Sequence, residues 1–138
     1  MNTILVIDDN KDILENLIEF FELEGYKSLA ANNGIRGVDL AREFIPDLII
    51  CDVKMIGMDG YAVLHLLLET PETYKIPFIF STSLCESVTR TEALSLGADD
   101  YIVKPFEMES LLRIVRIWIK SGSNRQSNTA CKNEGVQA

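Results

Sequence analysis

Short apolar runs rich in β-branched residues alternate with segments of helical periodicity from the N-terminus to about residue 120. The apolar residues at positions 13, 14, 17, 18 and 21, for example, fall on one face of a helix. The pattern predicts strands at residues 3–7, 27–31, 48–52, 78–81 and 101–103, and helices that end near residues 25, 44, 68, 97 and 120.

Strict alternation of strand and helix predicts an α/β fold with three layers, in which a doubly wound, five-stranded parallel sheet lies between two layers of helices. The run from Leu48 to Cys51 is uninterrupted by polar residues, which is typical of a strand buried on both faces. Sheets of this kind bind ligands at the carboxyl ends of their strands. The residues at those ends are therefore the candidates for function.

The composition narrows the class of protein. The 138 residues suffice for one domain, and the formal charge of −8 argues against direct contact with nucleic acid. Acidity suits a basic protein partner, but it is also common in soluble proteins. No apolar run is long enough to span a membrane and no leader segment precedes the first strand, so we expect a cytoplasmic protein. Residues 1–121 form the predicted domain, and residues 122–138 a polar, disordered tail.

Polar residues gather at the predicted strand ends. Asp8 and Asp9 follow the first strand, Asp52 ends the third, Thr82 follows the fourth, and Lys104 ends the fifth. Three carboxylates brought together repel one another unless a cation joins them, and hard oxygen ligands suit Mg²⁺. A carboxylate can attack phosphorus to form an acyl phosphate, while a hydroxyl and an ammonium hold phosphoryl oxygens. The set predicts Mg²⁺-dependent phosphoryl transfer.

These residues resemble the receiver domain of two-component response regulators, in particular single-domain regulators of the chemotaxis type. The resemblance covers residues 1 to 120 and implies a flavodoxin-like (βα)5 fold. It depends on elements that occur in family order and at family spacing: Asp8-Asp9, Asp52, Gly57-Met58-Asp59-Gly60, Thr82 and Lys104-Pro105-Phe106.

By this resemblance Asp52 is the phosphoacceptor. The metal would be held by Asp9 directly, by Asp8 through water, by Asp52 and by the carbonyl of Lys54. Thr82 and Lys104 would engage the phosphoryl oxygens, and Tyr101 would be the aromatic switch. The implied phosphodonor is a sensor histidine kinase, a phosphotransfer protein or a small acyl phosphate. The implied output surface is formed by the fourth helix, fifth strand and last helix, which would contact a downstream protein or form a homodimer.

The chain departs from the family pattern near Asp52 and Thr82. Ile56 stands where the family has Pro, which should loosen that loop. Ser83 replaces the usual Ala but is still small. Lys54 and Leu84 occupy the two positions that tune how readily water attacks the acyl phosphate in this family. We expect the bulky Leu84 to shield the phosphate and slow dephosphorylation.

Other interpretations compete with these assignments. Ser81 and Ser83 are alternatives to Thr82, and Tyr101 is also consistent with an ordinary half-buried strand aromatic. The last helix carries more apolar residues than one buried stripe needs, which indicates either a contact surface or deeper packing. Rival functions are a phosphorylation-independent scaffold, a Mg²⁺-dependent phosphohydrolase, which would need an acid at Lys54, and a flavin carrier, whose phosphate the carboxylates at Asp8 and Asp9 would repel.

Overall fold

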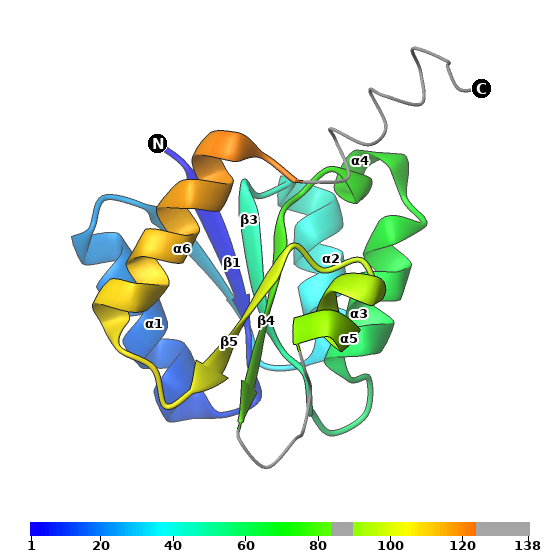
Figure 1. Cartoon of the computed structure of the whole chain (residues 1–138), viewed down its shortest axis with the longest axis horizontal. Helices are drawn as coiled ribbons and strands as arrows, with labels where there is room; N and C mark the ends of the chain where they lie inside the picture. The colour runs from blue at the N-terminus through cyan, green and yellow to red at the C-terminus, as the bar shows by residue number, and fades with distance from the viewer. Residues whose placement is uncertain (84–89, 124–138) are drawn as a thin grey trace.

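The computed structural model describes residues 1–83 and 90–123 and contains a five-stranded parallel sheet in the order β2-β1-β3-β4-β5 (Figure 1). The strands are β1 (Thr3–Ile7), β2 (Lys27–Ala31), β3 (Leu48–Asp52), β4 (Phe78–Ser83) and β5 (Asp100–Lys104). The predicted sheet is confirmed. β4 continues two residues past its predicted end, because Thr82 and Ser83 pair with β5.

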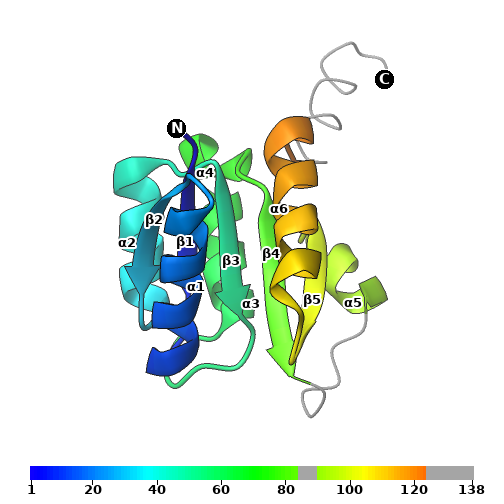
Figure 2. The ribbon, with the colours of Figure 1, turned by 90° about the vertical axis from the view of Figure 1, so that its left-hand side faces the viewer.

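Helices cover both faces of the sheet, with α1 and α6 on one side and α2, α3 and α5 on the other (Figure 2). Their bounds are α1 (Lys11–Leu23), α2 (Gly34–Phe44), α3 (Gly60–Leu68), α4 (Pro71–Tyr74), α5 (Arg90–Ser95) and α6 (Met108–Ser121). The sequence pattern did not predict α4, since four residues are too few to show a helical period. Residues 84–89, which precede α5 in the helix predicted to end near residue 97, lie outside the described residues.

The sheet separates two apolar clusters. Alternate residues of β3 enter opposite clusters, so that Leu48 and Ile50 face α1 and α6, whereas Ile49 and Cys51 face α2 and α3. All five residues of β3 are buried, as the uninterrupted apolar run predicts. β3 is therefore held from both sides, and this gives Asp52 at its end a fixed position.

Side-chain caps start the helices that border the sheet edge where β1 and β3 end. The Asn10 side chain accepts a hydrogen bond from the Ile13 N–H at the start of α1, and the Asp59 side chain accepts one from the Ala62 N–H at the start of α3. Gly25 follows α1 with a φ of +94°, which is consistent with the predicted end of this helix near residue 25. The loops after β1 and β3 are thus each tied to a helix start.

At the opposite end of the sheet, the chain after α6 packs onto a buried carboxylate. Asp99 accepts hydrogen bonds from the Phe78 N–H at 2.9 Å and from the Ser123 hydroxyl at 3.0 Å. Ser123 is itself buried, so the packed chain continues past the expected domain end at residue 121. The remainder of the predicted tail lies outside the described residues. Within residues 1–83 and 90–123, no helix is both long and apolar enough to cross a membrane.

The apolar excess of α6 has mostly a structural explanation. Ile114, Trp118 and Ile119 pack against the cluster between α6 and the sheet. The Trp118 indole N–H also donates to Asp100 at 3.0 Å, which satisfies its polar group. Ile117 by contrast is 51% exposed, so one large apolar side chain of α6 is available to a partner.

Candidate acidic site at the sheet edge

Two carboxylates lie side by side because β1 and β3 are paired in register. Ile7 is opposite Cys51, so Asp8 and Asp52 follow as neighbours at the carboxyl ends of their strands. Both carboxylates are buried, with 2% and 5% of each residue exposed, whereas Asp9 is exposed. One carboxylate oxygen from each of Asp8, Asp9 and Asp52 lies within 4.8 Å of the others. The structure therefore brings together the three predicted carboxylates.

Backbone N–H groups orient two of these carboxylates. Asn10 donates its N–H to Asp8 Oδ1 at 2.9 Å, and Ile56 donates its N–H to Asp9 Oδ2 at 3.3 Å. The second contact joins the loop after β1 to the loop after β3. The sequence offered no signal for it, since the donor is a main-chain group 47 positions from its acceptor. The Ile56 side chain points to solvent and is 91% exposed.

Lys104 supplies the positive charge of the site. Its Nζ lies 2.9 Å from Asp8 Oδ2 and 3.5 Å from Asp52 Oδ1. Partial burial alone would lower the pKa of Lys104, but the hydrogen bond and charge of Asp8, together with Asp52, outweigh it and raise the pKa above its usual value. The ammonium is therefore charged at neutral pH and offsets part of the repulsion among the carboxylates.

Four of the predicted switch and tuning residues lie within the part of the chain that the structure describes: Thr82, Tyr101, Lys54 and Ser83. Thr82 is buried, and its hydroxyl donates to the Ser83 carbonyl at 3.3 Å. Tyr101 is half-buried against the α2–α3 side of the core, which fits both interpretations of this residue. Lys54 is exposed and Ser83 is half-buried, while Leu84 lies outside the described residues.

A close backbone approach and a buried thiol were not predicted. Gly60 donates its N–H to the Val53 carbonyl at 2.7 Å, and a Cβ at Gly60 would overlap the Asp52 carbonyl oxygen. Only glycine fits there, so α3 begins directly against the backbone of the site.

Cys51 lies next to Asp52, and burial, with a smaller contribution from the Asp52 charge, raises the pKa of its thiol well above the usual value. That thiol is neutral and inert.

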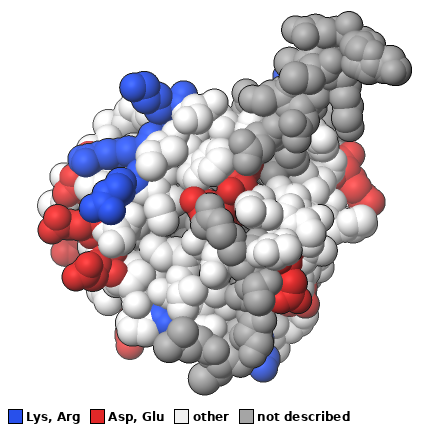
Figure 3. Space-filling model, in the orientation of Figure 1, with Lys and Arg blue, Asp and Glu red and all other residues white. Residues whose placement is uncertain are grey.

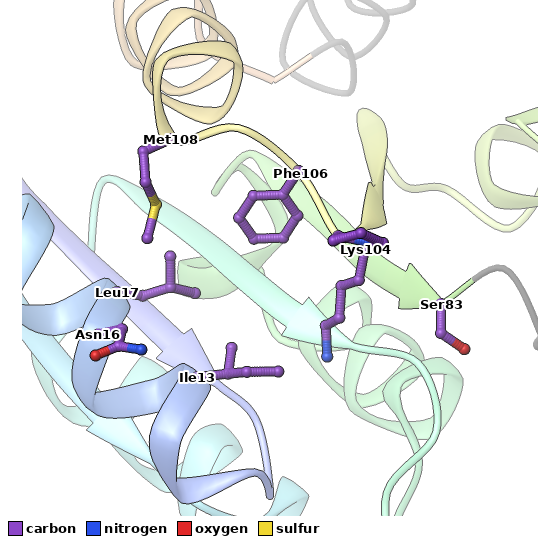
Figure 4. A pocket seen from close by; sticks show the side chains of 8 residues that line it. Ile13, Asn16, Leu17, Ser83, Lys104, Phe106 and Met108 are labelled. Atoms are coloured by element: carbon purple, nitrogen blue, oxygen red, sulfur yellow. The ribbon is translucent and has the colours of Figure 1, made fainter.

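An apolar pocket of about 390 Å³ lies beside Lys104, between α1 and the start of α6. Figure 4 shows Lys104 extending away from Phe106 and Met108, which face Ile13 and Leu17 of α1 across the pocket. Lys104 thus borders both this apolar surface and the carboxylate cluster, and a molecule seated in the pocket would lie next to the candidate site.

Comparison with known proteins decides the family. Residues 4–116 match the model of the response regulator receiver domain. The chain belongs to the response regulator receiver domain family. It shares 36% identity over 116 residues with the regulatory protein AtoC of Escherichia coli, covering 84% of this chain and 25% of AtoC. It shares 34% identity over 115 residues with protein PilH of Pseudomonas aeruginosa, covering 83% of this chain and 95% of PilH. The receiver domain thus spans nearly all of PilH but a quarter of AtoC.

Solved receiver domains share the same architecture. A response regulator from Chloroflexus aurantiacus superposes with a TM-score of 0.80 at 28% identity, covering 86% of this chain and 98% of that one. The receiver domain of the sensor histidine kinase PA1611 from Pseudomonas aeruginosa superposes with a TM-score of 0.77 at 29% identity, covering 87% and 98%. The PA1611 domain holds a magnesium ion in its active-site cleft. The predicted doubly wound receiver fold is confirmed.

The carboxylate cluster of this receiver domain fits a divalent cation. Asp8, Asp9 and Asp52 offer only oxygen ligands from two adjacent strand ends, and one oxygen of each lies within 4.8 Å of the others. Mg²⁺ prefers such ligands and completes its shell with water or phosphate oxygens. Lys104 already forms ion pairs with two of these acids, as is expected where positive charge is favourable.

Proposed function

We propose that this receiver domain is a phosphorylation-dependent switch in which Asp52 accepts a phosphoryl group in a Mg²⁺-dependent step. The donor would be a sensor histidine kinase, a phosphotransfer protein or a small acyl phosphate. The observation that carries the proposal is the convergence of Asp8, Asp9 and Asp52 within 4.8 Å, with the Lys104 ammonium on two of them. Carboxylates at strand ends that had only a structural role would not need to lie around one shared cation.

Each residue has a distinct role in this step. An Asp52 carboxylate oxygen would bond to phosphorus as the donor's bond to phosphorus breaks. Asp8, Asp9, Asp52 and the Lys54 carbonyl would hold Mg²⁺, which neutralises phosphoryl charge when bound. The Lys104 ammonium, now on Asp8, would turn to the phosphoryl oxygens as their charge arrives.

The switch would pass from the site to the surface through Thr82 and Tyr101. The Thr82 hydroxyl would leave the Ser83 carbonyl for a phosphoryl oxygen, and the Tyr101 ring, half-buried in this structure, would turn inward. Both residues lie on strands next to α5. The output surface would exist in two forms. Phosphorylation would shift the equilibrium toward the form that interacts more favourably with the phosphoryl group, and the shift would equal the difference between the two interaction free energies.

The output surface would be the α5–β5–α6 face, formed by α5, β5 and α6. Leu94, Leu96 and Ile117 are 39%, 48% and 51% exposed in its vicinity. In Figure 3 the Lys and Arg side chains gather over α6, with Asp and Glu side chains next to them on the outer side and mostly uncharged surface toward the centre of the view. Such a surface fits a downstream protein or a second copy of the chain.

Two further features would influence the rates of phosphorylation and of dephosphorylation. The apolar pocket beside Lys104 gives a phosphodonor protein a packing surface next to Asp52. Lys54, Ser83 and Leu84 would tune attack of water on the acyl phosphate. The protein would then be a switch with slow self-dephosphorylation rather than an enzyme with turnover.

Intact mass spectrometry tests the proposal. The wild type, Asp52→Asn and Asp12→Asn are incubated with acetyl phosphate, with and without Mg²⁺. Asp12 is an exposed acid on α1 and serves as the matched control. We expect one phosphoryl adduct on the wild type and on Asp12→Asn with Mg²⁺, and none on Asp52→Asn. A wild type without an adduct under all conditions would favour a phosphorylation-independent scaffold.

A further inference from the structure

Within the part of the chain that the structure describes, the Ser81 hydroxyl is buried without a hydrogen-bond partner. Ser81 is 2% exposed, and its Oγ is inaccessible and makes no hydrogen bond among residues 1–83 and 90–123. The other residues at the start of β4 are Phe78, Ile79 and Phe80, so an apolar residue is compatible with this strand. An unpaired buried hydroxyl is unfavourable, because it loses its hydrogen bonds to water, and its presence in β4 calls for an explanation.

Strand pairing places this hydroxyl beside the phosphoacceptor. Ser81 is opposite Asp52 in the β3–β4 register, and the Ser81 carbonyl accepts a hydrogen bond from the Val53 N–H at 3.1 Å. Ile50 and Ile79 lie in the same apolar cluster, on the α1–α6 side of the sheet. Ser81 and Asp52 are two residues further along, so their side chains project to that same side.

In the described row of residues across the sheet, one of the two strand neighbours of Ser81 carries a polar side chain. Ser81 lies between Asp52 of β3 and Ile102 of β5. Ile102 offers no polar side-chain atom. Neighbouring strands lie about 4.8 Å apart, and rotation about χ1 redirects the Ser81 Oγ across the gap toward Asp52.

We propose that Ser81 is a positioning residue for Asp52, and that its hydroxyl turns to donate a hydrogen bond to the Asp52 carboxylate. This inference depends on the proposed function, because it concerns the same phosphoacceptor. Thr82 cannot perform this role from its observed position, since the next residue of β4 projects to the opposite side of the sheet. The two hydroxyls would thus serve different groups, Thr82 the phosphoryl oxygens and Ser81 the carboxyl group.

The consequence concerns hydrolysis of the acyl phosphate. A water oxygen bonds to phosphorus, the bond between phosphorus and the Asp52 oxygen breaks, and its electron pair stays on the carboxylate. The water proton passes to solvent, and orthophosphate leaves. A hydroxyl donates more strongly to a carboxylate than to the carbonyl of an acyl phosphate. The Ser81 hydroxyl therefore stabilises the group that is released, and it shortens the lifetime of the phosphorylated form.

The lifetime is measured on four proteins: wild type, Ser81→Ala, Ser81→Thr and Ser28→Ala. Ser28 is a matched control, because its Oγ is also buried without a partner among the described residues but lies on β2, opposite Ile4 and two strands away from Asp52. After phosphorylation with acetyl phosphate and Mg²⁺ and removal of the donor, intact mass follows loss of the adduct. We expect a lifetime roughly fivefold longer for Ser81→Ala, equivalent to one ordinary hydrogen bond, with wild-type lifetimes for the other two variants.

A purely structural role for Ser81 gives a different result. Ser81→Ala and Ser28→Ala would then both raise the urea midpoint and leave the lifetime unchanged, which would overturn the proposal. A second readout needs no phosphoryl transfer: the ¹³Cγ resonance of Asp52 at fixed pH with saturating Mg²⁺. We expect it to move in Ser81→Ala and to return toward wild type in Ser81→Thr. If the wild type takes no adduct, the proposed function fails, and an unmoved resonance in Ser81→Ala would separately overturn the role of Ser81.

Discussion

The Nζ atom of Lys104 lies 2.9 Å from Oδ2 of Asp8, a residue 96 positions earlier in the chain, and 3.5 Å from Oδ1 of Asp52. The Lys104 side chain is 17% exposed and that of Asp8 is 3% exposed, so this ion pair is largely shielded from water. The ammonium therefore acts as the internal counter-ion of the carboxylate cluster.

Lys104→Met should destabilise the protein without Mg²⁺, because it leaves the buried Asp8 carboxylate without its cation. We expect a loss of about 1.5–3 kcal/mol in the free energy of unfolding. Since the pKa of Lys104 is raised, the wild-type advantage is fully present below the unfolded pKa, near 10.4, and is lost as the pH rises through the higher folded value.

Urea unfolding in EDTA at pH 7, 9 and 11 measures this difference. The wild type and Lys104→Met should differ equally at pH 7 and pH 9, and the difference should shrink at pH 11. Other alkaline titrations affect both proteins and cancel in the comparison. A constant difference up to pH 11 would show that lost packing, and not the charge of Lys104, is responsible.

Gly60→Ala should disturb the phosphoacceptor through the backbone. The new Cβ would overlap the Asp52 carbonyl oxygen and approach the Val53 Cα to 3.0 Å, so the strand end or α3 must shift. We expect a loss of about 1–3 kcal/mol in the free energy of unfolding and a lower yield of phosphoryl adduct. Gly25→Ala is the control, because Gly25 has a φ of +94° but no atom within 4 Å of its added Cβ. It should lose stability yet keep its adduct yield, and an equal yield in Gly60→Ala would contradict this explanation.

Asp9→Asn should have opposite effects on stability with and without Mg²⁺. Removing one of three clustered charges lessens repulsion, so the melting temperature in EDTA should rise slightly. The wild type should gain about 1.4 kcal/mol of stability at a Mg²⁺ concentration ten times its dissociation constant, and the variant should gain much less. Differential scanning calorimetry with a Mg²⁺ series measures both effects. If Mg²⁺ stabilises the two proteins equally, Asp9 is not a ligand of the metal.

The sequence predicted those parts of the molecule that depend on periodicity and strand order. The apolar pattern of residues 48–52 predicted a buried strand, and its expected parallel pairing with the first strand predicted that Asp8 and Asp52 lie together, as the structure shows. The three-acid cluster followed from topology alone, without knowledge of any side-chain conformation. The sheet and the meeting of the acids were thus accessible before the structure.

The remaining features depend on how far side chains and loops reach. The sequence placed Lys104 near the acids, but it did not show that the ammonium lies closer to Asp8 than to Asp52. The bond from the Ile56 N–H to Asp9 and the contact of Gly60 with the Asp52 backbone involve main-chain atoms, which carry no residue-type signal. Such details are set by tertiary packing and not by local propensity.

The buried carboxylate of Asp99 provides a test at the end of the sheet opposite the site. Asp99→Ala removes the acceptor for both the Phe78 N–H and the Ser123 hydroxyl in a buried part of the molecule. We expect a loss of about 2–4 kcal/mol in the free energy of unfolding, whereas Ser123→Ala should lose about 1 kcal/mol. Urea unfolding measures both values. Because the site is at the other end of the strands, the adduct yield of folded Asp99→Ala should equal that of the wild type. A reduced yield would mean that the two ends of the sheet are coupled through β4 and β5.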